Sequence, residues 1–446
     1  MQKNFNVLIN SKLPRFNKRI LVDSDKSISI RSFLIGSISN NISKVKNVLE
    51  SEDVFSTIEC LKKLGVKIKK IKPKQYKIFG KNLGSLHIKK KKEIYFGNSG
   101  TLARLLIGIL STTPNIEVKI KGDQSLNRRN MKKIINLMNK FGATFLPKNK
   151  YNFPLKLISS SMPTQIYYES GVSAQLKSAV ILAGLNAFGI TKIIEKSKSR
   201  DHTENMLAQN KRVIQINKKT RLINIIGKKY LDPINVTVPG DPSSAAFFTA
   251  LTLLNSNSKI LIKNICLNPS RIGFYKILKK QGAKIKFKNV RKINSEKVGD
   301  ILVNSCKLEP IKASQNYYVS MTDEYPILFV VVALTKGIST FKGIEDLTNK
   351  ESNRISEMQK ILKQIGVKSI YSKNELKIFG KDKNNFEHKK IIVNTLGDHR
   401  ICMSSFVLSI LIGANTKIKN FDTVFTSAPS FLKIMNYLGA KFEIQK

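Results

Sequence analysis

The chain has 446 residues, of which 41% are hydrophobic and 24% are charged, and apolar clusters recur along its whole length. This length is enough for two or three domains with cores of their own, which excludes a peptide-sized scaffold and a disordered polyelectrolyte. With 78 Lys and Arg residues against 30 Asp and Glu residues, the formal net charge is +48, so an anionic partner has to be considered.

The positive charge is scattered in short groups of lysines, such as residues 89–92 and 279–280. Aromatic residues do not alternate with these lysines, as a surface that stacks on bases would require. The chain is also rich in Asn and Ile, and an AT-rich coding sequence favours Lys, Asn and Ile together. We therefore expect no specific nucleic acid partner. A nucleic-acid-binding protein without catalysis and a structural protein or pseudoenzyme are the alternatives from other classes.

No apolar run reaches the roughly 18 to 20 residues that a membrane span needs, and the first residues lack the apolar core of a signal peptide. We expect a cytoplasmic protein with no membrane association. Cys60, Cys266, Cys306 and Cys402 lie far apart with no CxxC pair, so we expect four reduced thiols and no metal site. Glycine-rich dinucleotide and nucleotide fingerprints are absent, and no cofactor is expected.

Six segments share one design, in which a cluster of Gly, Ser, Asp or Asn precedes about ten apolar residues with helical character. They begin near residues 26, 98, 171, 241, 323 and 398, at intervals of about 70 to 82 residues. This period exceeds that of solenoid repeats, so each unit should be a small layer of helices and strands. The apolar segments predict helices that are buried on all sides.

Short alternating segments at residues 191–195, 223–226 and 391–394 predict strands. Further helices end where a Gly follows the last helical turn and a β-rich segment begins, and this Gly should take a left-handed conformation. These ends fall in residues 60–68, 138–145, 277–287, 361–370 and 435–442. The repeated unit therefore combines strands with two helices.

Cations stand beside the polar clusters, for example Arg104 in the second segment and Arg400 in the last. The N-termini of buried helices attract anions, although N-capping by Ser, Asp and Asn explains any one cluster alone. Asp323, Glu351 and Asp398 supply carboxylates in the same neighbourhoods. Cations for charge and a few carboxylates for protons suit acid/base chemistry on an anionic substrate.

A series of motifs between about residue 20 and about residue 430 resembles the 5-enolpyruvylshikimate-3-phosphate (EPSP) synthase family, also called 3-phosphoshikimate 1-carboxyvinyltransferases. In the family's order, they are DKSISIR, NSGTLARLL, GDQSLNRRNM, SAQLKSAVILAGL, SRDHTENML, VPGDPSSAAFF, DEYP, KESNRI and GDHRICM. The SAQ, SRDHTE and DPSSAAFF forms look most like the branch called class II.

The resemblance implies an α/β enolpyruvyl transferase fold with two domains, six βαβαββ repeats, three per domain, and an active site in the interdomain cleft. Residues 1–22 and 239–446 would form one domain and residues 23–238 the other, in a chain expected to be a monomer. The implied reaction of the shikimate pathway transfers the enolpyruvyl group of phosphoenolpyruvate to the 5-hydroxyl of shikimate 3-phosphate and releases phosphate through a tetrahedral ketal.

By motif position, the resemblance also implies the site residues. Phosphoenolpyruvate would be held by Lys26, Gly100, Arg129, Gln175, Arg354 and Arg400. Shikimate 3-phosphate would be held by Ser27, Arg31, Ser173, Gln175, Arg200, Asp323 and Lys350. The catalytic residues would be Asp323, Glu351, Lys26 and Lys350, with Asp323 as the base for the hydroxyl and Glu351 with Lys350 handling the proton at C3. Alternatively, Asp323 is an N-cap, Glu351 pairs with a nearby cation and Gln175 is a satisfied buried amide.

Some positions depart from the family's pattern. Asp23-Ser24 replaces a Pro-Gly pair at a domain crossing, Ile30 replaces a His, and Asn353 replaces an Asp beside Arg354. A Lys that some members carry near the C-terminus is missing from residues 426–429. The nearest rival within the same fold is UDP-N-acetylglucosamine enolpyruvyl transferase, whose loop Cys has no counterpart between Cys60 and Cys266.

Overall fold

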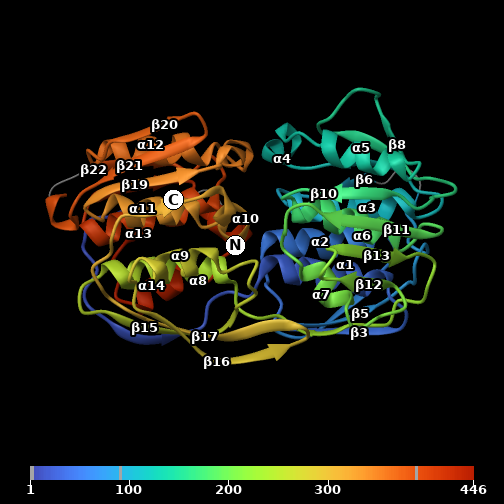
Figure 1. Cartoon of the computed structure of the whole chain (residues 1–446), viewed down its shortest axis with the longest axis horizontal. Coiled ribbons are helices and arrows are strands. Elements are labelled where there is room, and N and C mark those ends of the chain that lie inside the picture. The colour runs from blue at the N-terminus through green and yellow to red at the C-terminus, as the bar shows by residue number, and fades with distance from the viewer. Residues whose placement is uncertain (1–4, 90–92, 387–389) are drawn as a thin grey trace. The chain divides into compact units, whose positions relative to one another are not determined.

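The computed structural model describes residues 5–89, 93–386 and 390–446 (Figure 1). The chain divides into two compact units that both draw on distant parts of the sequence. Unit 1 comprises Met1–Asp23, Pro239–Arg291 and Lys297–Lys446, and unit 2 comprises Ser24–Val238 and Lys292–Glu296.

Unit 2 contains three four-stranded sheets. The first has the order β14-β3-β5-β4, with β14 Asn235–Thr237, β3 Ile42–Lys46, β5 Gln75–Phe79 and β4 Lys67–Lys72. The second has the order β6-β7-β9-β8, with β6 Glu93–Tyr95, β7 Glu117–Lys121, β9 Leu155–Ile158 and β8 Thr144–Leu146. The third has the order β10-β11-β13-β12, with β10 Tyr167–Ser170, β11 Ile190–Glu195, β13 Leu222–Ile226 and β12 Ile214–Asn217.

Unit 1 contains three sheets of the same size. The order β16-β17-β15-β2 comprises β16 Ile285–Ile293, β17 Glu296–Asn304, β15 Lys259–Cys266 and β2 Asn17–Ile20. The order β18-β19-β21-β20 comprises β18 Lys312–Ala313, β19 Gly337–Lys342, β21 Glu375–Gly380 and β20 Ser369–Ser372. The order β22-β23-β1-β24 comprises β22 Lys390–Asn394, β23 Asn415–Lys419, β1 Asn6–Ile9 and β24 Glu443–Gln445.

Each sheet combines a parallel pair of strands with an antiparallel neighbour. In four sheets an apolar helix connects the parallel pair, as a crossover requires. The other two parallel pairs join distant segments: β2 lies beside β15 with Asn17 opposite Lys259, and β14 lies beside β3 with Asn235 opposite Lys44. The six mixed sheets with their helices confirm the predicted repeat fold.

The six apolar segments form buried helices, as predicted. They are α1 Lys26–Ile38, α3 Gly100–Thr112 and α6 Ala174–Gly184 in unit 2, and α8 Pro242–Leu254, α11 Tyr325–Ala333 and α13 His399–Ile412 in unit 1. Every residue of α8, α11 and α13 is buried. In unit 2, α3 contacts α1 and α6, and in unit 1, α8, α11 and α13 contact one another (Figure 1). These helices form the inner layer because no face of them is polar enough to meet water.

The second helices of the repeats pack an apolar face inward and end as the sequence predicts. They are α2 Glu52–Lys63, α5 Lys132–Lys140, α9 Gly273–Lys280, α12 Arg354–Gln364 and α14 Phe431–Tyr437. A glycine with positive φ follows each one, from Gly65 at 83° to Gly439 at 96°. The predicted strands also form, as β11, β13 and β22. The shorter helices are α4 Gln124–Arg128, α7 His202–Leu207, α10 Tyr318–Met321, η1 Gln315–Tyr317, η2 Glu345–Asn349, η3 Lys383–Asn385 and η4 Phe421–Thr426.

The four cysteines are free thiols, as predicted, and three of them are buried. Burial raises the pKa of Cys60 to about 12, so this thiol stays protonated and unreactive near neutral pH. Within the described part of the chain, no helix is both long enough and apolar enough to cross a membrane.

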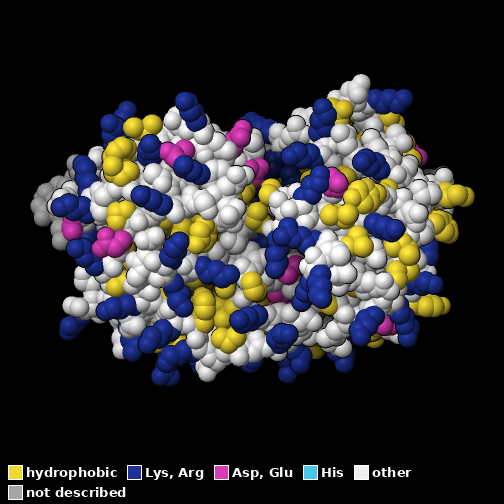
Figure 2. Space-filling model, viewed as in Figure 1, with side chains coloured by type: hydrophobic (Ala, Val, Ile, Leu, Met, Phe, Trp, Pro, Cys, Tyr) yellow, Lys and Arg dark blue, Asp and Glu magenta, His cyan; other side chains and the backbone are white. Residues whose placement is uncertain are grey.

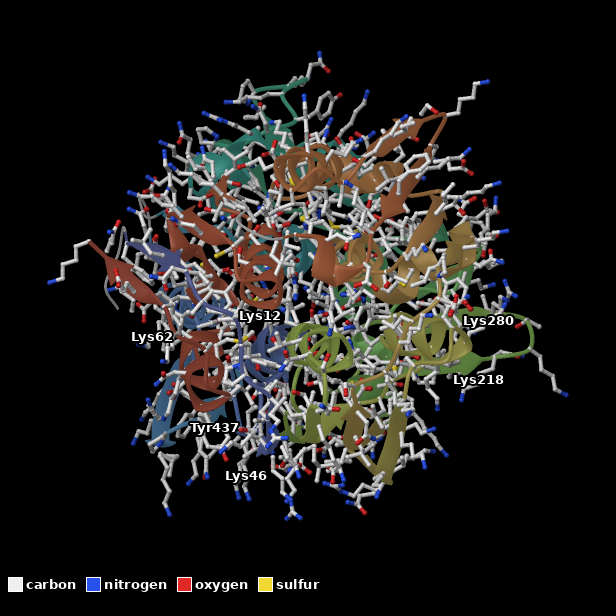
Figure 3. All side chains as sticks on the ribbon, turned by 90° about the vertical axis from the view of Figure 1, so that its left-hand side faces the viewer. Lys12, Lys46, Lys62, Lys218, Lys280 and Tyr437 are labelled. Carbon is white, nitrogen blue, oxygen red and sulfur yellow. The ribbon has the colours of Figure 1, made fainter. Side chains whose placement is uncertain are left out.

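Lys and Arg side chains are scattered over the face drawn in Figure 2, with a few acidic side chains among them. Of the residues labelled in Figure 3, Lys12, Lys46, Lys62, Lys218 and Lys280 are exposed and come from separate elements and loops. This dispersion agrees with the scatter of lysines along the sequence.

Candidate active site

The first site residues of unit 2 lie at the start of α1. Asp25 caps this helix, and its side chain accepts a hydrogen bond from the Ile28 N–H at 2.8 Å. Lys26 is the first helical residue and is followed by Ser27. The Nζ atom of Lys26 lies 3.0 Å from Oδ2 of Asp53 on α2. The Lys26 side chain is only 16% exposed, so this carboxylate compensates a largely buried positive charge.

Arg31, one turn further along α1, is buried and held by hydroxyl groups. Its Nε donates to Thr203 Oγ1 at 2.9 Å and its Nη2 donates to Ser178 Oγ at 3.1 Å. The Thr203 hydroxyl in turn donates to Ser178 Oγ at 2.8 Å. This network joins α1, α6 and α7 around one guanidinium group.

Two further guanidinium groups lie against the start of α3. Arg129 Nη2 donates to Asn98 Oδ1 at 2.7 Å, and Arg104 Nη1 donates to the Gly100 carbonyl at 3.0 Å. A Cβ on Gly100 would lie 2.8 Å from Arg104 Nη1 and 2.9 Å from Arg129 Nη1. A Cβ here would therefore displace the ends of both arginine side chains from this helix end, where the helix dipole also favours an anion.

The start of α6 carries Ser173 and Gln175. Ser173 is the N-cap and accepts a weak hydrogen bond from the Leu176 N–H at 3.4 Å. Gln175 is half-buried, and its Nε2 donates to Thr101 Oγ1 on α3 at 2.9 Å. Arg200 is half-buried in the segment that connects β11 with α7. In unit 2, the expected site residues thus lie at the starts of α1, α3 and α6, just after α4, or on the segment that connects β11 with α7.

In unit 1, the guanidinium of Arg354 is surrounded by three carboxylates. Its Nε lies 2.9 Å from Asp398 Oδ2, its Nη2 lies 2.6 Å from Glu351 Oε2, and its Nη1 lies 3.6 Å from Asp323 Oδ1. Burial alone would lower the pKa of Arg354, but Asp398, Glu351 and Asp323 raise it overall. One cation with three anions leaves an excess of negative charge, a favourable setting for a group that must accept a proton.

Of the alternative roles that the sequence left open for Asp323 and Glu351, the structure excludes one and shows the other. Asp323 is not the N-cap of α11, since Glu324 occupies that position and makes no side-chain capping bond. Glu351 does pair with a nearby cation, Arg354, and its side chain is still 22% exposed. Lys350 Nζ lies 2.5 Å from Asp346 Oδ2, a carboxylate that also accepts a hydrogen bond from the Tyr318 hydroxyl at 2.7 Å.

Arg400 contrasts with Arg354. It is only 5% exposed, and its guanidinium carbon lies 5.9 Å above the centroid of the Phe247 ring. Among the described residues, nothing accepts a hydrogen bond from its Nε or Nη1. Burying a guanidinium group without such partners costs free energy unless a bound anion accepts its hydrogen bonds.

Two departures from the family's pattern have local structural explanations. Asn353 caps α12, and its Oδ1 accepts from the Ser356 N–H at 3.1 Å, a role that Asn fills as well as Asp. Asp23 is buried and accepts from the Ser430 N–H at 2.9 Å and the Ser430 hydroxyl at 2.8 Å. These bonds anchor the crossing segment to the start of α14, whereas a Pro-Gly pair has no side-chain oxygen that could accept them. Ile30, on α1, is fully buried.

Several partners of the site residues were not identified from the sequence. Asp53 is one, and a signal for it exists, because a carboxylate on the apolar face of an amphipathic helix usually has a cationic partner. Ser178 lies in the motif SAQLKSAVILAGL and Thr203 in SRDHTENML, but no sequence signal connects them with Arg31. The same is true of Thr101 and Gln175.

Comparison with known proteins identifies the family. Residues 11–435 match the EPSP synthase (3-phosphoshikimate 1-carboxyvinyltransferase) family. The chain is 36% identical over 442 residues to the 3-phosphoshikimate 1-carboxyvinyltransferase of Zymomonas mobilis, covering 98% of this chain and 97% of the relative. It is 37% identical over 435 residues to that of Thermoanaerobacter sp., covering 96% and 100%.

The solved structures agree with the sequence relatives. The EPSP synthase of Acinetobacter baumannii superposes with a TM-score of 0.84 at 31% identity, covering 100% of both chains. Six sheets of this design, the ordered motifs and full-length similarity to named enzymes lead to one conclusion: the chain belongs to the EPSP synthase family, the 3-phosphoshikimate 1-carboxyvinyltransferases.

Proposed function

We propose that this member of the family transfers the enolpyruvyl group of phosphoenolpyruvate to the 5-hydroxyl of shikimate 3-phosphate with the residues described above. The observation that carries the assignment of residues is Arg400, a buried guanidinium whose Nε and Nη1 find no hydrogen-bond acceptor in the described chain. An anionic substrate would supply that acceptor, and a planar guanidinium suits a carboxylate or a phosphate.

The site residues divide between the two substrates. Phosphoenolpyruvate is held by Lys26, Gly100, Arg129, Gln175, Arg354 and Arg400. Shikimate 3-phosphate is held by Ser27, Arg31, Ser173, Gln175, Arg200, Asp323 and Lys350. The close approach of Arg104 and Arg129 to Gly100 supports the first assignment, since two guanidinium groups at one helix end favour an anion there. Three carboxylates also contact Arg354, so the same guanidinium that binds phosphoenolpyruvate orients these carboxylates.

Asp323 takes the proton of the 5-hydroxyl as the oxygen attacks C2 of phosphoenolpyruvate, and C3 accepts a proton to give the tetrahedral ketal. The ketal then loses a proton from C3 while the C2–O bond to phosphate breaks, which restores the double bond. Glu351 and Lys350 handle the C3 proton, and Lys26 compensates the charge of the departing phosphate. The partial exposure of Asp323 and Glu351, 26% and 22%, supports these roles, because both carboxylates are accessible while anchored to Arg354.

The finer assignments rest on sequence features. The SAQ, SRDHTE and DPSSAAFF motifs support membership of class II. Residues 1–22 with 239–446 and residues 23–238 would be the functional domains, in a monomeric enzyme. Four free cysteines are compatible with the reducing conditions of the cytoplasm, the proposed location.

The test is phosphate release by the purified protein mixed with both substrates. We expect turnover that needs both phosphoenolpyruvate and shikimate 3-phosphate, and a Michaelis constant for phosphoenolpyruvate that rises about 10-fold or more in Arg400→Lys, since a planar fork becomes a point charge. The fold of the variant is checked by circular dichroism. Absence of phosphate release from the folded wild-type protein would contradict the proposal, and an unchanged Michaelis constant in the variant would remove Arg400 from the site.

A further inference from the structure

Unit 2 contains a buried ionic triad that the reaction described above does not use. Lys177 on α6 is 0% exposed, and its Nζ lies 2.6 Å from Glu195 Oε1 and 2.5 Å from Glu204 Oε1. The Glu204 side chain is 4% exposed and that of Glu195 is 16% exposed. One cation therefore holds two carboxylates inside the unit.

The two carboxylates mark both ends of one connecting segment. Glu195 is the last residue of β11, and Glu204 lies in the first turn of α7. The segment between them, residues 195–204, contains Arg200 and is called here the Arg200 segment. Residues 196–201 are not part of a helix or strand, so side-chain contacts at the two ends restrict its conformation.

Lys177 also belongs to the helix that carries two other site residues. Ser173 is the N-cap of α6 and Gln175 lies in its first turn, immediately before the triad. The next residue, Ser178, accepts hydrogen bonds from Arg31 on α1 and from Thr203 on α7. Lys177 thus connects the Arg200 segment to α6, whose neighbouring residue Ser178 contacts α1 and α7.

Stability alone gives a weak reason for such a triad. Burying a charge costs free energy, and apolar residues of similar volume often serve stability as well or better than a buried ion pair. The triad also has an unbalanced charge, since two carboxylates face one ammonium group. Burial alone would lower the pKa of Lys177, but Glu204 and Glu195 raise it overall, so Lys177 is charged at neutral pH. Buried ionic groups with defined geometry are better suited to fixing one arrangement among several.

We propose that Lys177 is a positioning residue that clamps both ends of the Arg200 segment, so that Arg200 is held in place to bind the phosphate of shikimate 3-phosphate. This inference rests on the proposed role of Arg200 and adds Lys177, Glu195 and Glu204 to the residues that determine substrate affinity without touching the substrate.

The sharpest variant is Glu195→Ala. It removes one side-chain contact of the segment and leaves Lys177 with Glu204 as a balanced pair, so the fold is preserved. The backbone N–H groups of Glu195 and Lys196 still donate to Arg221 and Ser170. We expect the dissociation constant for shikimate 3-phosphate, measured by titration calorimetry, to rise about 10-fold, since a loosened binding group loses its preorganisation. Glu195→Gln keeps an oxygen acceptor and should recover most of the affinity.

A double-mutant cycle with Arg200→Ala distinguishes clamping from general support. If Glu195 acts through Arg200, then Glu195→Ala should weaken binding little further once Arg200 is gone. Glu117→Ala is the matched control, because it removes an exposed ion pair between Glu117 on β7 and Lys156 on β9 of the same unit and should leave affinity unchanged. Lys177→Met should weaken binding at least as much as Glu195→Ala, provided that it folds.

The outcomes separate this inference from the proposed function. Failure of the folded wild-type protein to bind shikimate 3-phosphate or to release phosphate refutes the proposed function. Wild-type turnover, combined with Glu195→Ala affinity within about 2-fold of wild type, overturns the clamp alone. Additive losses from Glu195→Ala and Arg200→Ala would also overturn it, because they would show that the triad does not act through Arg200.

Discussion

Replacing Asp323 by Asn tests the proposed base most directly. Asn has almost the same size and can still accept a hydrogen bond, but it cannot take up the hydroxyl proton. A positioned acid or base contributes about 10²- to 10⁴-fold to a rate, so turnover should fall by roughly that factor. Shikimate 3-phosphate should still bind, because Ser27, Ser173 and Arg200 lie in unit 2 and are unaffected by the change.

The structure also sets the expected change in stability. Asp323 Oδ1 lies 3.6 Å from Arg354 Nη1, and two unit charges at this distance attract by about 5 kcal/mol at an effective dielectric constant of 20. Repulsion from Glu351 and Asp398, which share the same guanidinium, and the desolvation of Asp323 offset most of this attraction. We therefore expect the free energy of unfolding to change by less than about 1 kcal/mol.

The assay combines phosphate release, calorimetry with shikimate 3-phosphate and thermal melting on the same preparations. Glu357→Gln is the matched control, since it converts a carboxylate on α12 that pairs with Lys360 and lies outside the cluster. Near-wild-type turnover in Asp323→Asn would refute the assignment of the base. A large fall in melting temperature would instead show that the cluster supports the fold and that the electrostatic balance above is wrong.

Gly100→Ala should fold normally but bind phosphoenolpyruvate more weakly, because its Cβ would displace the flexible ends of Arg104 and Arg129; calorimetry measures this, and unchanged affinity would contradict it. Glu204→Gln should gain stability over wild type as the pH rises. Burial raises the pKa of Glu204, so its contribution is present below the unfolded pKa of about 4.3 and is lost as the pH rises through the folded value. Urea unfolding at pH 4.5 and pH 7 measures the difference, which must grow with pH. DNA binding in a gel-shift titration should be weak, without sequence preference, and lost near about 0.2 M salt, because the Lys and Arg side chains are dispersed. Tight, selective binding at that salt concentration would contradict this prediction.

Local features of the chain could be predicted from the sequence because they depend on neighbouring residues. Apolar runs longer than a helical turn and without charges predict α8, α11 and α13 as buried helices, since no face of them can meet water. A glycine after a last helical turn predicts the helix ends at Gly65 and Gly439, since glycine has no Cβ that would disfavour the left-handed region. The ordered motifs were enough to predict the family, which the full-length relatives confirm.

The pairing of distant residues was decided only by the tertiary structure. The sequence placed Lys350 beside Glu351, but the fold pairs Lys350 with Asp346 and Glu351 with Arg354. It also brings Asp53 to Lys26 and places β2 beside β15, partners that no local pattern relates. The difference has a physical origin: capping and burial of a helix follow from residues within a few turns, whereas the partner of a buried charge depends on which helices and strands pack together around it.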